Sequence, residues 1–324
     1  MKYKESILYG IRSKRFLKYL LRIPNDSYFD QQFVAGLICP YIDKKKPRLI
    51  EPPSENLKAI QARLKRIFHC LPVDNNIFSG IKGRSYPGNA KIHIGNKYVY
   101  KIDLTAFFPC ISREKIYLFF LKSFDLSPDV AEVLTNLTTV NLDFAQSKNK
   151  DDVNKFLNLK GIKTRNHLIS GAPTSQILSY LANYSMFNEI KACCDDNKVI
   201  VSVLVDDLTF SSDKKISYKF KLTIQNIIKK HFYRLSKGKS KNYTKGYRKE
   251  ITGVVIKADG TITLTNALQY KIIREFNCYR NHIEDKSSRK RLSGLLSAAR
   301  QVNPNVFPRI YGFLKETSKK IRVL

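Results

Sequence analysis

The chain has 324 residues, of which 43% are hydrophobic, so it can bury a large core without disulfide bonds. Its 58 Lys and Arg against 27 Asp and Glu give a net charge of +31, far more than solubility requires, which predicts a polyanionic partner such as nucleic acid. Its six cysteines show no CxxC spacing, and its apolar runs are too short to span a membrane. We therefore expect a reduced, cytoplasmic protein without a zinc site.

The region before residue 97 is predicted to form helices and one ribbon. Residues 40–53 are polar and rich in proline, a pattern that favours an exposed ribbon over a helix. Ser54 can cap the helix that follows it. Apolar residues recur in that helix at spacings of three and four, namely Leu57, Ile60, Leu64 and Ile67.

Two predicted strands in the middle of the chain end in acids. The alternation from Tyr98 to Asp103 predicts a strand that Asp103 closes. A β-branched run over residues 199–205 is interrupted by Asp206 and Asp207 and then resumes. This pattern predicts a hairpin with two acids at its tip.

The remaining elements are mostly helices. Helices are predicted from Ser112 through Phe119, from near Pro173 through Tyr184, and over residues 216–235. Residues 147–155 are polar and predict a surface insertion. Residues 251–265 fold back around an Asp-Gly turn as a hairpin, and two or three basic helices follow.

The acids at the strand ends suit one kind of chemistry. Nucleotidyl transfer by two metals needs carboxylates that converge on one point, where divalent ions about 4 Å apart hold the attacking and leaving oxygens. Asp103, Asp206 and Asp207 all end hydrophobic strands in a chain short of acids. We therefore interpret them as ligands of two Mg²⁺ ions, with Mn²⁺ as the alternative, although acids at a hairpin tip are also common without a function.

Several segments resemble those of known polymerases. Three of them are similar to motifs A, B and C of reverse transcriptases, in the same order and spacing: KIDLTAFFPCI at 101–111, SGAPTSQ at 170–176 and LVDDLTF at 204–210. Two more resemble the NAxxH and VTG motifs of bacterial retron reverse transcriptases: NAKIH at 89–93 and ITG at 251–253.

The resemblance implies an α/β right-hand polymerase fold. Fingers and N-terminal helices would occupy residues 1–97. A palm with an antiparallel sheet would follow over 98–265, with a fingers insertion at about 112–170. A helical thumb would occupy residues 266–324, its basic helices packing on a nucleic-acid duplex, on the palm, or on both.

The resemblance also assigns metal and nucleotide roles. Asp103 and Asp206 would be metal ligands, Asp207 a less direct third carboxylate, and the backbone carbonyl of Leu104 an extra ligand. Arg48 would grip the triphosphate of the incoming dNTP, with Lys46 assisting, since a planar guanidinium suits phosphate oxygens.

Other nucleotide contacts carry over in the same way. Phe108 would be the aromatic gate that favours deoxynucleotides, with Phe107 as the alternative. Lys239 would protonate the pyrophosphate leaving group, with Lys237 and Lys241 as competitors. The turn that approaches the nucleotide would comprise Gly171, Ala172 and Pro173.

The retron motifs imply further roles. A lone histidine such as His93 is more often a core residue than a metal ligand. The resemblance implies a structural or RNA-binding role for Asn89 and His93, and an RNA-binding role for Thr252 and Gly253.

The sequence also departs from the family pattern. Leu204 stands where a tyrosine is usual, Ser170 where a glutamine is usual, and Gln176 where a proline is usual. These changes leave the carboxylates intact, and we still expect activity.

The implied function is synthesis of a branched RNA–DNA product (msDNA) from a cognate structured non-coding RNA, primed from a guanosine 2′-OH. The implied role is anti-phage defence with a partner effector protein. The alternatives are a group II intron or diversity-generating reverse transcriptase, and a non-catalytic RNA-binding scaffold.

Overall fold

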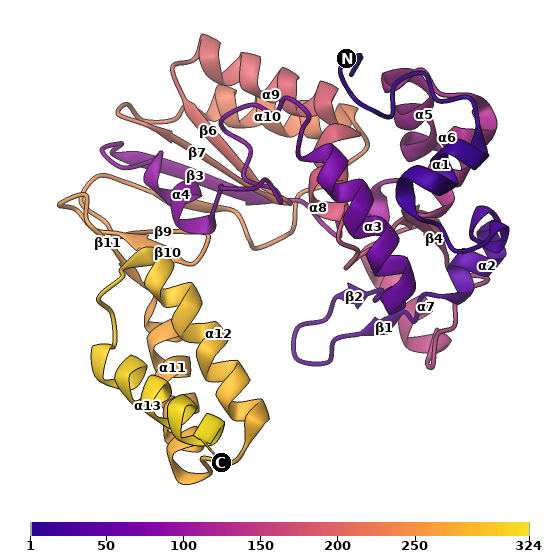
Figure 1. Ribbon diagram of the computed structural model, residues 1–324. Coiled ribbons are helices and arrows are strands. Elements are labelled where there is room, and N and C mark those ends of the chain that lie inside the picture. The colour runs from indigo at the N-terminus through magenta and orange to yellow at the C-terminus, as the bar shows by residue number, and fades with distance from the viewer. Residues whose placement is uncertain (1, 324) are drawn as a thin grey trace.

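The computed structural model describes residues 2–323, which form three groups of elements (Figure 1). A group rich in N-terminal helices and a group of C-terminal helices flank a central antiparallel sheet. This arrangement agrees with the expected fingers, palm and thumb.

The fingers group combines the start of the chain with the predicted insertion. Contacts of α1 with α6, of α2 with β4 and of α7 with β1 join the two parts. Its elements are α1 (Lys14–Leu21), η1 (Asp26–Phe29), α2 (Gln31–Gly36), β1 (Tyr41–Ile42), β2 (Leu49–Ile50), α3 (Glu55–Phe68), η2 (Phe108–Cys110), α5 (Arg113–Ser123), α6 (Pro128–Asn136), β4 (Thr139–Asn141), α7 (Lys150–Lys160) and β5 (Asn166–Leu168). The Ser54 side chain caps α3, and β1 pairs with β2 as the expected ribbon.

The palm is built on a four-stranded sheet with the order β6-β7-β3-β8. Its strands are β3 (Tyr98–Asp103), β6 (Ile200–Leu204), β7 (Asp207–Ser212) and β8 (Lys241–Tyr243). Its helices are α4 (Tyr86–Lys91), α8 (Ser175–Leu181), α9 (Tyr184–Asp196) and α10 (Tyr218–Lys230). The predicted hairpin of β6 and β7 is confirmed.

The two faces of this sheet differ because side chains alternate along each strand. Helices α9 and α10 lie together over one face (Figure 1). There the buried ring of Phe210 packs against Tyr100 at 5.8 Å and Phe220 at 5.7 Å between centroids. The alternate residues, including Asp103 and Asp207, belong to the opposite face.

The C-terminal group has its own core. It contains the three-stranded sheet β11-β10-β9, whose strands are β9 (Lys249–Ile251), β10 (Val254–Ile256) and β11 (Ile262–Leu264). Its helices are α11 (Asn266–Asn281), α12 (Lys286–Val302) and α13 (Pro308–Val323). Ile251 and Val254 share a buried cluster with Leu292 and Leu296, so this core extends across the predicted boundary at residue 265.

Three predictions need refinement. Residues 147–155, predicted as a polar surface insertion, include the start of helix α7, which Asn149 caps and in which the Val153 side chain is buried. The helix expected from Pro173 to Tyr184 is two helices, since the Asn183 amide donates to the Ser179 carbonyl at 2.8 Å and interrupts the ladder. Helix α10 ends at Lys230 rather than near residue 235, because the chain turns left-handed at Phe232.

No helix among residues 2–323 combines the length and the apolar character needed to cross a membrane.

Candidate active site

The structure brings the three predicted aspartates to one corner of the palm sheet. Asp103 closes β3 and lies directly opposite Asp207, the first residue of β7. The backbone N–H of Leu104 donates to the carbonyl of Asp206 at 2.9 Å. The antiparallel register of β3 and β7 therefore joins residues that are about a hundred positions apart in the sequence.

The hairpin tip between β6 and β7 is strained. Val205 is the first residue of a two-residue turn and has φ +61°, in the left-handed region that a β-branched residue rarely adopts. Its N–H donates to the Ser79 hydroxyl at 2.7 Å, which helps hold the turn in place. Backbone strain of this kind is concentrated at functional sites, where the surrounding structure maintains it.

The carboxylates of the corner repel one another. Burial, together with the charges of Asp103 and Asp207, raises the pKa of Asp206 to about 6. Burial also raises the pKa of Asp207, and Asp103 adds to that effect. The site therefore concentrates negative charge that a cation would stabilise.

Two residues that follow α10 bind the Asp103 side chain. The Lys239 ammonium lies 2.9 Å from both carboxylate oxygens of Asp103, and the Ser236 hydroxyl donates to Oδ1. Burial acts to lower the pKa of Lys239, but its bond to Asp103 and the charges of the three aspartates raise it overall. Lys239, rather than Lys241, which lies in β8 opposite Lys101, is therefore the lysine at the corner.

Sequence reasoning missed Ser236. Its backbone N–H also donates to the Asp103 carbonyl at 2.8 Å, so it fixes both the main chain and the side chain of that residue. The segment around it carries no motif, and only the pairing of Leu235 with Leu104 brings it to the site.

The residues fit divalent cations by their chemistry. Three carboxylates, and a main-chain carbonyl at Leu104, are the hard oxygen donors that Mg²⁺ prefers. Within residues 2–323, however, no group of three or more His, Cys, Asp or Glu side chains is placed so that it could hold a metal ion. The Lys239 ammonium forms an ion pair with Asp103 at 2.9 Å.

The two phenylalanines of motif A have different surroundings. Phe107 is 3% exposed and packs edge-on against Tyr233 at 5.2 Å and Phe187 at 6.3 Å. Phe108 is only partly buried. The positive φ of Ala106, +46°, turns the chain between these rings and Asp103. Of the two candidates for the gate, only Phe108 reaches the surface.

The ribbon that carries Arg48 is fastened to the turn of motif B. The backbone N–H of Glu51 donates to the Ser170 carbonyl at 2.7 Å, and the Ser170 N–H donates to the Glu51 carboxylate at 2.6 Å. The Ser170 hydroxyl donates to the Leu49 carbonyl at 2.9 Å. Ser170, which departs from the family pattern, thus joins the two segments predicted to hold the nucleotide.

The neighbouring turn leaves its backbone accessible. Gly171 has φ +120°, a conformation that favours glycine, and it is exposed beside Glu51, whereas Ala172 is buried. Arg48 is 65% exposed and lies 3.6 Å from Asp43 across the ribbon.

Glu51 has a second partner that the sequence did not reveal. His167 Nε2 lies 2.9 Å from a Glu51 carboxylate oxygen, and both side chains are fully buried. The backbone of His167 also forms an antiparallel β-bridge with that of Ser112, whose side chain caps α5. A buried carboxylate needs such partners, so this cluster holds the ribbon, the motif B turn and α5 together.

The structure favours the structural alternative for the NAxxH residues. His93 is 0% exposed, and its ring nitrogens each lie 2.7 Å from a hydroxyl, those of Ser202 on β6 and Ser211 on β7. Burial lowers the pKa of His93 to about 3, so the ring is neutral. Asn89 is 1% exposed. The expected RNA contact by these two side chains is therefore not available in this conformation, since neither reaches the surface.

The ITG segment lies against the NAxxH helix. The Asn89 amide donates to the Thr252 hydroxyl at 3.3 Å, and that hydroxyl donates to the Tyr86 carbonyl at 3.1 Å. Thr252 is half-buried, whereas Gly253, with φ +82°, is exposed. Of the four residues predicted to bind RNA, Gly253 is the most accessible.

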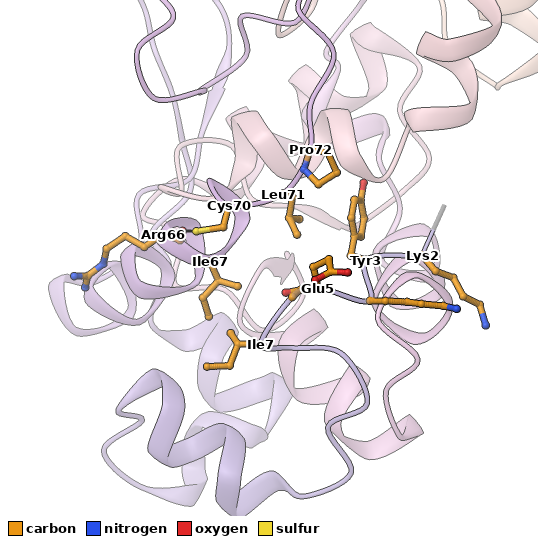
Figure 2. Close-up of a pocket in the computed structure, with 11 residues that line it drawn as sticks. Lys2, Tyr3, Glu5, Ile7, Arg66, Ile67, Cys70, Leu71 and Pro72 are labelled. Atoms are coloured by element: carbon orange, nitrogen blue, oxygen red, sulfur yellow. Dashed lines mark hydrogen bonds between the residues drawn. The ribbon is translucent and has the colours of Figure 1, made fainter.

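A cavity of about 660 Å³ lies away from the aspartates, between the N-terminal segment and the end of α3 (Figure 2). Tyr3, Ile7, Ile67 and Leu71 give it an apolar lining. It contains none of the predicted site residues.

Comparison with known proteins identifies the class. Residues 40–290 match the family described as reverse transcriptase (RNA-dependent DNA polymerase), and the chain belongs to this family. The right-hand fold class is thereby confirmed.

The curated relatives narrow the resemblance to retrons. The Retron Se72 reverse transcriptase of Salmonella heidelberg (strain 579083-10) is 28% identical over 239 residues, which cover 73% of this chain and 55% of that protein. The Retron Ec83 reverse transcriptase of Escherichia coli is 26% identical over 85% of both chains. The expected resemblance to bacterial retron reverse transcriptases is confirmed, although the chain spans only about half the length of the Salmonella relative.

A solved structure, that of the foamy viral protease-reverse transcriptase dRH in complex with ds DNA, matches at a TM-score of 0.44 with 16% identity. The match covers 89% of this chain and 39% of that one.

Proposed function

We propose that this protein is an RNA-directed DNA polymerase of a retron. The observation that carries the proposal is the convergence of Asp103, Asp206 and Asp207 at one corner of a palm sheet in a chain of the reverse transcriptase family. Asp103, Asp206 and the Leu104 carbonyl would hold the metal, with Asp207 as a less direct third carboxylate. A bound Mg²⁺ would supply Lewis-acid chemistry there, acidifying the attacking hydroxyl and stabilising charge on the phosphate oxygens.

The chain's own residues then orient the nucleotide. Arg48 holds the triphosphate from the ribbon, and Gly171, Ala172 and Pro173 bring backbone close to the base and sugar. The Phe108 ring excludes a ribose 2′-OH. Lys239, which is positively charged at neutral pH, donates a proton to the leaving pyrophosphate.

The substrate we propose is a cognate structured RNA, copied into DNA from a 2′-OH primer. The charge of +31 supports a polyanionic partner, and the retron relatives support the class of RNA. A cytoplasmic location and a role in phage defence with a partner effector belong to the same proposal.

Primer extension tests the polymerase activity. The native chain should incorporate dNTPs on an RNA template with Mg²⁺ or Mn²⁺, and the Asp206→Asn/Asp207→Asn variant should not. A native chain that incorporates no dNTP with either metal would support the non-catalytic scaffold. RNA that copurifies with the chain should carry covalently attached DNA if the retron assignment is correct.

A further inference from the structure

Phe232 has both an unfavourable backbone conformation and an unfavourably exposed ring. It follows α10, the residue is 93% exposed, and its φ is +67°. A Cβ makes the left-handed region unfavourable, and an exposed phenyl ring leaves apolar surface in water. The isolated chain therefore loses stability at this position without gaining any packing.

The segment around Phe232 is rigid, so its exposure does not come from a frayed end. The next residue, Tyr233, is 3% exposed, and its hydroxyl donates to Asn183 at 2.7 Å. The Arg234 guanidinium donates to the Gly161 carbonyl at 3.0 Å, and the Arg234 carbonyl accepts from the Thr105 N–H at 2.8 Å. The ring is thus presented on a fixed segment bonded to the chain two residues after Asp103.

The surroundings of Phe232 are cationic. Lys229, Arg234 and Lys237 are exposed on the same segment. The neighbouring acid, Glu189, is already bound to Lys230 at 2.9 Å and to His231 at 3.0 Å. The Arg234 guanidinium also donates to the carbonyl of Lys160 in the last turn of α7, where Leu159 is 81% exposed. An exposed ring among cations is the chemistry of a site for single-stranded nucleic acid, because bases stack on the ring and cations neutralise phosphates.

We propose that Phe232 is a stacking platform for an unpaired base of single-stranded RNA, with Lys229, Arg234 and Lys237 beside the phosphates. A rigid ring suits this use, because little conformational entropy is lost on binding. The proposal deepens the proposed function and rests on it for the identity of the strand as RNA.

The Phe232→Gly variant separates binding from folding. Glycine removes the ring and also relieves the left-handed backbone. We expect a melting temperature equal to or above that of the native chain. We expect the affinity for a fluorescein-labelled oligouridylate, measured by anisotropy, to fall about tenfold. The slope of log Kd against log salt should not change, because no phosphate contact is removed.

Tyr218→Ala is the matched control. Tyr218 is 79% exposed at the other end of α10, so its loss should leave oligouridylate affinity unchanged. An undiminished affinity in Phe232→Gly, or an equal fall in both variants, would overturn the platform. So would a lowered melting temperature in Phe232→Gly, since the ring would then be packing within the folded chain. Undiminished RNA affinity would instead direct attention to a protein partner at this surface.

The two proposals can fail separately. A native chain that binds oligouridylate through Phe232 but extends no primer would refute the polymerase and retain the platform. A chain that extends a primer while Phe232→Gly binds as well as the native chain would refute only the platform.

Discussion

Two regions of this molecule are built in opposite ways. In the aspartate corner, formed by Asp103, Asp206 and Asp207, like charges repel one another beside the left-handed Val205. In the α4 clasp, formed by Tyr86, Asn89 and His93 with Thr252, Ser202 and Ser211, both nitrogens of a neutral histidine are bonded inside the protein. The first region lowers the stability of the folded chain, and the second raises it.

The difference teaches how to interpret conspicuous motifs. Both regions carry residues that the sequence marks equally clearly, but only in the aspartate corner do buried charges repel one another. Such repulsion indicates chemistry or ligand binding, whereas a neutral ring that is bonded at both nitrogens indicates a structural role. The clasp also reaches the thumb, because the Tyr86 hydroxyl donates to the Ala298 carbonyl on α12 at 2.6 Å.

The largest expected effect is a loss of dNTP incorporation when an acid of the aspartate corner is replaced. Asp206→Asn should reduce dNTP incorporation about a thousandfold or more, since the proposed metal ligand is lost. The same variant should raise the free energy of unfolding of the metal-free protein by about 2 to 3 kcal/mol at pH 7, because a carboxylate with a raised pKa is neutralised. Primer extension and urea unfolding measure the two effects.

The control for this variant is Asp196→Asn, an exposed acid at the end of α9. It should change neither quantity by much. A destabilised Asp206→Asn protein would show that the carboxylate is stabilised by its surroundings and would contradict the proposed repulsion.

A substitution in the α4 clasp should instead lower the stability of the folded chain. His93→Ala should lower the free energy of unfolding by about 3 kcal/mol, because the buried Ser202 hydroxyl loses its partner, the Ser211 hydroxyl keeps only its bond from Asn96, and a cavity remains. Urea unfolding at neutral pH measures the loss. Protein that remains folded should still incorporate a single nucleotide, and if incorporation falls about a thousandfold without loss of stability, His93 acts at the site instead.

The pH dependence sharpens the contrast. The folded pKa of His93, about 3, lies below its unfolded value, so its stabilisation is present above pH 6.5 and is lost as the pH falls. The stability difference between the native chain and His93→Ala should therefore shrink by about 2 kcal/mol from pH 7 to pH 5.

The contribution of Asp206 to stability has the opposite pH dependence. Its folded pKa, about 6, lies above its unfolded value, so its destabilisation is complete above pH 6 and fades as the pH falls towards 4. The advantage of Asp206→Asn over the native chain should shrink by about 1 kcal/mol between pH 7 and pH 5. Urea unfolding at both pH values tests the two signs, and equal slopes for all three proteins would contradict both assignments.

The smallest expected effect concerns the Glu51 cluster, in which the buried Glu51 carboxylate is bonded to His167 and Ser170. The cluster lies beside the proposed nucleotide site. Glu51→Gln weakens the bonds to Ser170 and His167, so the ribbon of Arg48 and the motif B turn should lose their mutual alignment. We expect the KM for dNTP to rise about fivefold with a smaller change in kcat, as measured by steady-state incorporation.

Glu55→Gln is the control for this change. Glu55 lies four residues on, with its side chain 89% exposed, and its replacement should leave KM unchanged. A fall in kcat with an unchanged KM would show that the cluster does not position the nucleotide.

Part of this protein follows from its sequence alone. The alternation from Tyr98 to Asp103 and the β-branched run before Asp206 predict the palm strands and the hairpin tip, and the Asp-Gly turn predicts the hairpin of β10 and β11, because strand patterning is local. The ordered motifs predict the family, and the comparisons confirm it. Helix ends were less predictable, since the break at Asn183 depends on a side-chain bond rather than on composition.

Only the tertiary structure decided which partners these residues have. Ser236 reaches Asp103, His167 reaches Glu51, and His93 reaches Ser202 and Ser211 across more than a hundred positions of sequence. Such contacts depend on sheet register and on how separate layers pack, which no local pattern encodes. Burial, a property of the whole fold, lowers the pKa of His93 and raises the pKa of Asp206.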